Sequence, residues 1–408
     1  MSKKLFGKTT DGKEVYVYEL TNKNNMKACI LDYGANLQAL YVPDENGKVD
    51  DIVLGYDDVA SYEKNGSFFG AVIAPSANRI GDASFSIDGV DYKIDVNDGK
   101  NNLHSHYELG AHKRIWQAKE GENSVELSLS IEDMDMGFPG NKEFTLTYTL
   151  TDDNELILHY YCSSDKNTII NPTNHSYFNL YGAASGKDIL DCVLTLNCSA
   201  YTPVVPGAIP TGEIREVKGS VMDFTKGRRI GDDINDSFDQ LVMTQGYDHN
   251  FVVDGWDGNI KEIATVEAPG SLRKMTVFTD LPGVQFYAGN CIGKGPGKEG
   301  VVYDKRSALC LETQFYPDTI PAKYFLTPEP GQNDKVMEEN MGKGSLIINA
   351  TGLGKDRPGS PLTDAAQFPQ DAIVWEINYR GELTFMHQAE AQQAAKNLDE
   401  LLEKRYDK

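Results

Sequence analysis

A two-residue repeat of apolar side chains runs through the first 330 residues of the chain. It is clearest at residues 16–20, 125–131, 144–150 and 156–162. Successive side chains of a β-strand point to opposite faces, so this repeat is typical of strands with one buried face. Turn dipeptides such as Asp88-Gly89, which tolerate the positive φ of tight hairpins, separate the repeats. With no amphipathic helix apparent before residue 380, the pattern predicts a mainly β protein built as a large antiparallel β-sandwich.

The pattern changes after Pro330. Short apolar runs at residues 345–348 and 372–375 alternate with polar, glycine-rich segments. Alanines and leucines at spacings of three and four over residues 391–402 then predict an amphipathic helix. Strand, loop, strand and helix in that order favour an α/β unit. We therefore predict a β-sandwich domain over residues 1–330 and a small α/β extension over residues 331–408.

The charge of the chain excludes several classes of partner. Its 408 residues include 39 Lys and Arg against 61 Asp and Glu, a formal net charge of −22 at pH 7. Such a surface repels phosphate backbones and anionic lipid, so we expect neither nucleic acid nor a membrane as partner. No apolar run approaches the roughly 18 residues of a membrane span, and no secretory signal is visible at the N-terminus. A neutral polar ligand such as a sugar remains compatible with this charge.

The six cysteines show neither a CxxC motif nor a tight, even spacing. In a chain of this size such scattered cysteines are typical of reduced thiols. We therefore expect a cytoplasmic protein.

His175 and Glu312 are the first candidates for acid–base chemistry. His175 lies in the polar segment Asn171-Pro-Thr-Asn-His-Ser-Tyr-Phe-Asn-Leu180, whose side chains suit the orientation of an imidazole. Glu312 is flanked by Cys310 and Leu311, and partial desolvation raises a carboxyl pKa toward the range of a general base. A buried structural histidine and a buried Glu–Arg pair are the alternative interpretations.

His104 belongs to a loop segment, Asn101-Asn-Leu-His-Ser-His-Tyr107, of the kind that often carries sites. Together with His106 and His112 it suggests a metal site. Zinc sites, however, need three or four ligands in a defined geometry, and no cysteine lies nearby. We expect no metal, and for His106 and His112 a solvated loop is the simpler interpretation.

Arg79 and Asp248 are the candidates for binding hydroxyl groups. Arg79, in Ala77-Asn-Arg-Ile80, is the basic residue most clearly set among small and apolar residues, where it either grips ligand oxygens or pairs with an acid. Asp248 precedes an apolar run, where a carboxylate either accepts hydrogen bonds from a sugar or caps a turn.

Taken together, these segments resemble the aldose 1-epimerase (galactose mutarotase) family. The resemblance extends in sequence order over nearly all of residues 1 to about 330. It is carried by Ala77-Asn-Arg-Ile-Gly81, Phe85 with Asp88-Gly89, Asn102-Leu-His104, Gly137-Phe-Pro-Gly-Asn141, Asn174-His-Ser-Tyr-Phe-Asn-Leu180, Ile209-Pro-Thr-Gly-Glu213, Asp223-Phe224, Tyr247-Asp-His-Asn-Phe251, Val284-Gln-Phe-Tyr287, Leu311-Glu-Thr-Gln314 and Pro317-Asp318.

The resemblance implies the β-sandwich of mutarotases and interconversion of the α and β anomers of galactose, glucose or a related aldose. Glu312 matches the general base that removes the proton of the C1 hydroxyl, and His175 matches the general acid that protonates the ring oxygen. An acid and a base suffice for this reaction, so no cofactor is expected. The small aldose is the expected partner, and the chain is expected to act as a monomer or homodimer.

The same resemblance implies a set of residues around the sugar. His104 would lie near the ring oxygen. The residues expected to bind hydroxyls are Arg79, Asn78 and Asp248, and those expected to line the pocket are Gln285 and Phe286.

Two segments depart from the family pattern. Ala74-Pro-Ser76 stands where many members have Gly-Arg-Tyr, and Ser105-His106 stands where Gly-Gly is familiar. Both segments are expected near the pocket wall, where they bear on substrate preference. They also motivate an alternative, a non-catalytic sugar-binding module on the same sandwich. A hexose-6-phosphate epimerase is a further alternative, but a phosphate needs a basic cluster that this acidic chain lacks.

The tail resembles a different family. Residues 346–354, 356–362 and 378–381 are similar to the C-terminal part of the nucleotide-binding domain of the shikimate dehydrogenase family. The glycine-rich dinucleotide fingerprint that should precede such a segment is absent. We therefore expect a non-catalytic appendage, without dehydrogenase activity.

Overall fold

The computed structural model describes residues 1–318 and, beyond them, residues 346–349, 360, 362, 364, 366–368, 372–376, 384–391 and 395–397. These residues divide into two compact units. The first holds residues 1–318 apart from the Asp88–Val90 turn, and the second holds the described segments after residue 345. The predicted boundary near residue 331 lies outside the described residues.

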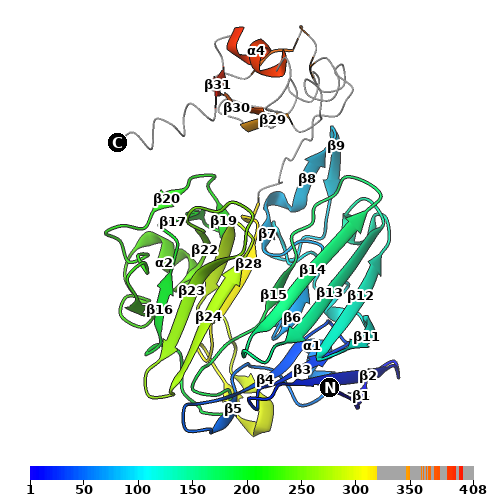
Figure 1. Cartoon of the computed structure of the whole chain (residues 1–408), viewed down its shortest axis with the longest axis vertical. Coiled ribbons are helices and arrows are strands. Elements are labelled where there is room, and N and C mark those ends of the chain that lie inside the picture. Colours follow the sequence, from blue (N-terminus) through cyan, green and yellow to red (C-terminus); the bar gives the residue numbers. More distant parts are fainter. Residues whose placement is uncertain are drawn as a thin grey trace. The chain divides into compact units, whose positions relative to one another are not determined.

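Four antiparallel sheets form the first unit, as the alternating pattern predicted (Figure 1). In the first sheet the strands follow the order β1 (Ser2–Lys8), β2 (Glu14–Thr21), β3 (Lys27–Leu31), β4 (Leu37–Pro43) and β5 (Val49–Asp51). In the second sheet the order is β11 (Gln117–Gly121), β12 (Ser124–Ile131), β13 (Lys142–Leu150) and β14 (Leu156–Ser164). Strand β13 buries every second residue along its whole length.

The other two sheets, coloured green to yellow, lie to the left of the second sheet in Figure 1. One has the order β21 (Arg228–Arg229), β16 (Val193–Leu196), β23 (Lys261–Ala268) and β24 (Arg273–Thr279). The other has the order β20 (Arg215–Glu216), β17 (Ala200–Tyr201), β22 (Asp248–Val252), β25 (Gly283–Tyr287) and β28 (Cys310–Gln314). One continuous cluster of buried apolar residues includes side chains from all four sheets, which makes the first unit a single sandwich.

Five two-stranded ribbons complete the first unit. They are β6 (Ala71–Ile73) with β15 (Thr173–His175), β7 (Arg79–Ile80) with β10 (Asn102–Leu103), β8 (Ser84–Ile87) with β9 (Val90–Lys93), β18 (Val204–Val205) with β19 (Ile209–Pro210), and β26 (Gly295–Pro296) with β27 (Val302–Tyr303). In the predicted hairpin β8–β9, Asp88 and Gly89 have φ of 53° and 72°, as a tight turn of the primed type requires.

The described helices of the first unit are short. They are α1 (Val59–Lys64), α2 (Asp239–Thr244) and the 3₁₀ turns η1 (Gly81–Ala83), η2 (Ala111–Lys113), η3 (Asp135–Gly137) and η4 (Lys298–Gly300). A helix of six residues is too short to show an amphipathic repeat, so the sequence pattern missed α1 and α2. Among the residues that the structure describes, no helix has both the length and the apolar character needed to cross a membrane.

The second unit contains a parallel three-stranded sheet of β29 (Leu346–Asn349), β30 (Ala372–Glu376) and β31 (Ala395–Asn397), together with helix α4 (Thr384–Ala391). Strands β29 and β30 coincide with the two predicted apolar runs. The helix predicted over residues 391–402 is wrong at β31, because residues 395–397 pair in parallel with residues 372–374. Pairing with a distant strand here overrides the helix preference of an alanine-rich segment.

Candidate active site

Strand β25 lies between β22 and β28 in the five-stranded sheet that ends with β28, called the central sheet below. Its pairing with both neighbours determines which side chains share a face. Gln285 pairs with Glu312 on one side and with Asn250 on the other. Directly opposed residues of antiparallel strands share a face, so these three polar side chains point to the same side. Asp248, Cys310 and Gln314 follow by the two-residue period. One face of this sheet is therefore polar although it is buried.

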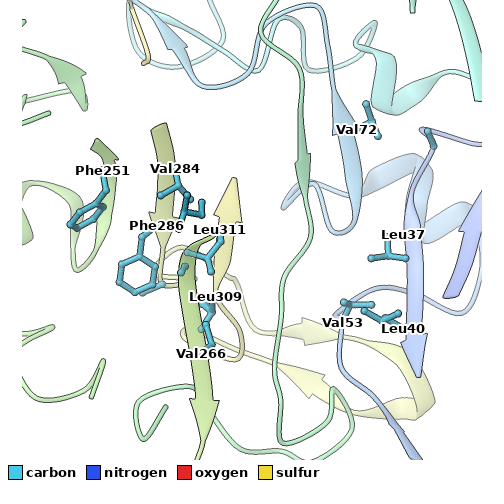
Figure 2. Packing of buried hydrophobic residues seen from close by; sticks show 14 of the residues in the cluster. Leu37, Leu40, Val53, Val72, Phe251, Val266, Val284, Phe286, Leu309 and Leu311 are labelled. Carbon is cyan, nitrogen blue, oxygen red and sulfur yellow. The ribbon is translucent and has the colours of Figure 1, made fainter. Parts of the chain in front are cut away.

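The opposite face of the same strands is apolar, and Phe286 belongs to it. The Phe286 side chain is 0% exposed and its ring lies 5.3 Å from that of Tyr247 and 5.5 Å from that of Phe224. Figure 2 shows it packed with Val284 and Leu311. The expectation that Phe286 lines the pocket is thereby corrected, because neighbouring residues of a strand cannot both face the site.

His175 is the last residue of the short strand β15. Side chains in and just before β15 form hydrogen bonds with the backbone in and just after β28. The Asn171 amide accepts a hydrogen bond from the Phe315 backbone N–H (2.9 Å) and donates one to the Phe315 carbonyl (3.2 Å). The Thr173 hydroxyl donates to the Thr313 carbonyl (2.9 Å). These bonds replace a regular strand ladder, and they place His175 Nε2 3.6 Å from Glu312 Oε1.

Two aromatic rings stack against the imidazole of His175. Tyr177 stacks on it at 5.0 Å with an interplanar angle of 21°, and Phe68 at 5.9 Å with an angle of 26°. Cys310 Sγ lies 3.6 Å from Nδ1. The ring plane is therefore fixed, with Nε2 directed toward Glu312.

His104 lies beside this pair, with ring centroids of His104 and His175 5.2 Å apart. Its backbone has a φ of +56° and bonds to the Asn78 carbonyl (3.0 Å). The Asn78 backbone N–H donates to His104 Nδ1 (3.1 Å). Nδ1 is therefore an acceptor, and a neutral His104 carries its hydrogen on Nε2. The backbone of Asn78 thus sets the tautomer of His104, while its side-chain oxygen accepts from the Arg79 N–H (2.8 Å).

Arg79 and Asp248 supply charge around the pair. Gln285 Nε2 donates to Asp248 Oδ1 (2.7 Å), and Arg79 Nε donates to Asp98 Oδ2 (2.7 Å). Arg79 is thus paired, as one of the two interpretations expected. Its charge also acts on Glu312 and on Asp248, opposing in each case the rise in pKa that burial causes.

Burial shifts the pKa values of His175 and Glu312 in opposite directions. It lowers the pKa of His175 to about 4 and raises the pKa of Glu312 well above its ordinary value, with the nearby Asp248 adding to the rise. Burial also lowers the pKa of His104. A desolvated carboxylate is a stronger base and a desolvated imidazolium a stronger acid, so both shifts favour proton transfer.

His104, His175 and Glu312 offer ligand atoms that all lie within 4.8 Å of one another, which is the one such group among the described residues. A metal needs a lone pair on each histidine, but His104 Nδ1 already accepts a hydrogen bond and leaves Nε2 with the hydrogen. The donor set therefore suits proton transfer better than a metal. His106 and His112 do not join this group: His106 Nδ1 accepts from two backbone N–H groups, and His112 Nε2 faces the Tyr107 carbonyl.

The two segments that depart from the family pattern contact each other. The Ser76 backbone N–H donates to Ser105 Oγ (2.8 Å), and the Ser105 hydroxyl donates to the Ser76 carbonyl (2.8 Å). Ser105 is fully buried with a φ of +67°. The two departing segments are therefore joined by one pair of hydrogen bonds, at the residue that follows His104 in the chain.

Sequence reasoning missed Phe68, Tyr177, Cys310 and Gln314. Cys310 and Gln314 stand two residues before and after Glu312, and Tyr177 stands two residues after His175, so the period of a strand was a signal for them. Phe68 lies 10 residues before Asn78, the next residue of the site along the chain, and no local pattern connects it to the site.

Comparison with known proteins shows to which family the chain belongs. The sequence pattern of the family described as aldose 1-epimerase matches residues 16–335. The chain belongs to the aldose 1-epimerase family. Galactose mutarotase from Bos taurus is 38% identical over 303 residues, covering 74% of this chain and 86% of that protein. Aldose 1-epimerase from Escherichia coli is 34% identical over 310 residues, covering 76% of this chain and 88% of that protein.

Solved structures of the aldose 1-epimerase family have the same fold. An aldose epimerase homologue from C. elegans has a TM-score of 0.68 at 28% identity, covering 74% of this chain and 90% of its own. Galactose 1-epimerase from Lactobacillus acidophilus also has a TM-score of 0.68, at 26% identity, covering 78% of this chain and 90% of its own. The sandwich of residues 1–318 is thus the fold of the aldose 1-epimerases.

Proposed function

We propose that this chain interconverts the α and β anomers of galactose, glucose or a related aldose, with Glu312 as general base and His175 as general acid. The observation that carries the proposal is the buried pair itself, with 3.6 Å between His175 Nε2 and Glu312 Oε1. Membership of the aldose 1-epimerase family supports the reaction, and the small sugar is the corresponding substrate.

In the proposed mechanism Glu312 takes the proton of the C1 hydroxyl while His175 Nε2 gives a proton to the ring oxygen. The ring C–O bond breaks, the C1–C2 bond rotates, and closure runs both transfers in reverse. Ring opening therefore converts a charged pair, carboxylate and imidazolium, into a neutral pair. Because burial disfavours the charged form of both groups, the neutral pair formed on opening is not penalised by the dry surroundings.

The surrounding groups suit the binding of hydroxyls. The hydrogen on His104 Nε2 makes it a donor beside the ring oxygen, and Asp248, with Gln285, offers an acceptor and a donor. Arg79 keeps N–H groups other than the one bonded to Asp98. We assign Asn78 the role of holding His104 and Arg79 through its backbone and side chain. No cofactor enters this mechanism, since an acid and a base suffice.

A phosphorylated hexose fits these surroundings poorly. The one arginine of the described site is paired with Asp98 and lies near the carboxyls of Glu312 and Asp248, so the described site lacks the basic cluster that a phosphate needs. A non-catalytic sugar-binding module does not need a buried acid–base pair, because binding a sugar requires no proton transfer. We therefore favour the epimerase over both alternatives.

Polarimetry of freshly dissolved α-galactose and α-glucose tests the proposal, with the wild type compared with Glu312→Gln. We expect equilibration faster than the spontaneous rate for the wild type, and loss of most of that acceleration in the variant. Equilibration at the spontaneous rate with both proteins would refute the epimerase, and saturable sugar binding in that case would favour the binding module.

The remaining assignments extend the proposal. We place catalysis in residues 1–330 and a non-catalytic role in residues 331–408, and we expect a cytoplasmic monomer or homodimer. Nicotinamide-dependent activity toward shikimate or quinate would contradict the assignment of the tail.

A further inference from the structure

Cys310 lies on the side of His175 away from Glu312. Its Sγ is 3.6 Å from His175 Nδ1, and its side chain is fully buried. It stands two residues before Glu312 on β28, so both side chains reach the same face of the sheet. Strand β28 therefore meets both nitrogens of the imidazole, one through a carboxyl and the other through a thiol.

The thiol has a second contact that completes its surroundings. The Tyr177 hydroxyl opposes the rise in the pKa of the thiol, and the Tyr177 ring stacks on His175 at 5.0 Å. A thiol is a weak donor and a weak acceptor, so the sulfur can accept a hydrogen from Nδ1 as well as from the tyrosine hydroxyl. Burial raises the pKa of Cys310 well above its ordinary value, which keeps the sulfur uncharged.

We propose that Cys310 is a positioning residue that accepts a hydrogen bond from His175 Nδ1 and so confines the exchangeable proton of His175 to Nε2. The proposal rests on the function proposed above. In that reaction Nε2 gives up its proton on ring opening and regains it on closure, while Nδ1 keeps its hydrogen throughout. The neutral ring must therefore be the Nδ1–H tautomer, whose Nε2 lone pair faces the site.

An uncharged sulfur performs this role differently from a carboxylate. A carboxylate at Nδ1 would stabilise the imidazolium and make His175 a weaker acid. Sulfur holds the tautomer and the ring direction without adding charge next to a histidine that burial already makes a strong acid. The alternative is that Cys310 acts merely as a small apolar side chain filling space.

The test compares Cys310→Ala and Cys310→Ser with the wild type, and uses Cys192→Ala, which removes another buried thiol, as the matched control. The first measurement is the ¹⁵N spectrum of the histidine rings at neutral pH. The chain has seven histidines, and His175→Gln identifies the His175 signals by their loss. We expect a protonated Nδ1 in the wild type and in Cys192→Ala, and a mixture of the two tautomers in Cys310→Ala.

The second measurement is the pH profile of anomer equilibration. For Cys310→Ala we expect kcat to fall about tenfold, the effect of losing one hydrogen bond, with KM nearly unchanged and the limbs of the profile shifted. Partial recovery in Cys310→Ser supports the proposal. Unchanged ¹⁵N shifts together with an unchanged profile in Cys310→Ala overturn it. If the wild type has no epimerase activity but the ¹⁵N spectra show the change of His175 tautomer in Cys310→Ala, the proposed function is refuted and the role of Cys310 in setting the tautomer is still supported.

Discussion

His175 Nε2 and Glu312 Oε1 lie 3.6 Å apart although they come from strands of different sheets, and both side chains are more than nine-tenths buried. The second carboxyl oxygen of Glu312 has no hydrogen-bond partner among the described residues. A buried, partly unsatisfied carboxyl next to an imidazole costs stability, and such costs are characteristic of functional sites.

Removing either member of the pair should abolish most of the catalysis. We expect Glu312→Gln and His175→Asn each to lower kcat by a factor of about 10² to 10⁴, the usual contribution of a positioned acid or base. Because the two groups act together, the double variant should be little worse than either single variant. Polarimetric kcat and KM values for the three proteins check this, and additive losses would argue for independent roles.

The pH dependence should be bell-shaped, because the pair is active with one proton between its two members. Acid adds a second proton by neutralising the carboxylate, and alkali removes the only one. Since the groups interact at 3.6 Å, the two limbs report pKa values of the pair rather than of one residue. A profile of kcat/KM that stays flat between pH 4 and pH 10 would contradict the shared proton.

Glu312→Gln should stabilise the protein at alkaline pH. The folded state raises the pKa of Glu312, so the carboxyl favours folding at pH values below its ordinary pKa, and that contribution is lost as pH rises through the folded pKa. The amide does not ionise, so the advantage of the variant in the free energy of unfolding should be larger at pH 8 than at pH 5. Urea unfolding at the two pH values measures it, and an equal difference at both would contradict the shift.

His249→Gln should make the protein less sensitive to acid. Burial lowers the pKa of His249 to about 3, so the unfolded chain binds a proton that the folded chain does not between about pH 6.5 and pH 3. The wild type therefore loses stability as pH falls through this window, and the glutamine variant lacks that loss. The slope of the unfolding free energy against pH from 7 to 4.5 is the measurement, whatever the cost of the substitution itself.

Gly70→Ala should disturb the segment behind His175. Gly70 has a φ of +69°, its N–H donates to the His175 carbonyl (3.0 Å), and an added Cβ would lie 2.3 Å from the Leu37 carbonyl oxygen. Gly186, with a φ of +68° and open space around it, is the matched control. Gly186→Ala should cost about 1 kcal/mol for the backbone conformation alone. Gly70→Ala should cost more and also lower kcat, and equal costs would show that the backbone shifts to relieve the contact.

The local elements were predictable, because alternation along a strand is a property of adjacent residues. Strands β12, β13 and β14 and the β8–β9 hairpin follow from it. The same alternation also predicts that Phe286 points away from the site, since its neighbour Gln285 lies on the face toward Glu312. Strand β31 shows the opposite case, in which a partner more than 20 residues away decides the structure.

The site itself was accessible through the family resemblance but not through local pattern. The bonds between Asn171 and Phe315 join residues 144 positions apart, and those between Ser76 and Ser105 join residues 29 apart. Contacts of this kind depend on the packing of whole sheets. A single sequence shows which residues are polar, whereas the fold decides which of them meet.

The sheet that contains β22, β25 and β28 has one polar and one apolar face. The site therefore depends on which residues of β28 point to each face, as much as on which residues the strand contains. A slip of β28 by one residue relative to β25, with the strands still paired, would turn Leu311 toward His175 and bury Glu312 against Phe251 and Val284. Such a chain would lose the base and place a carboxyl in the core by the same change. Insertions and deletions within β28 itself should therefore be tolerated only two residues at a time, or where a β-bulge restores the alternation of its side chains between the two faces.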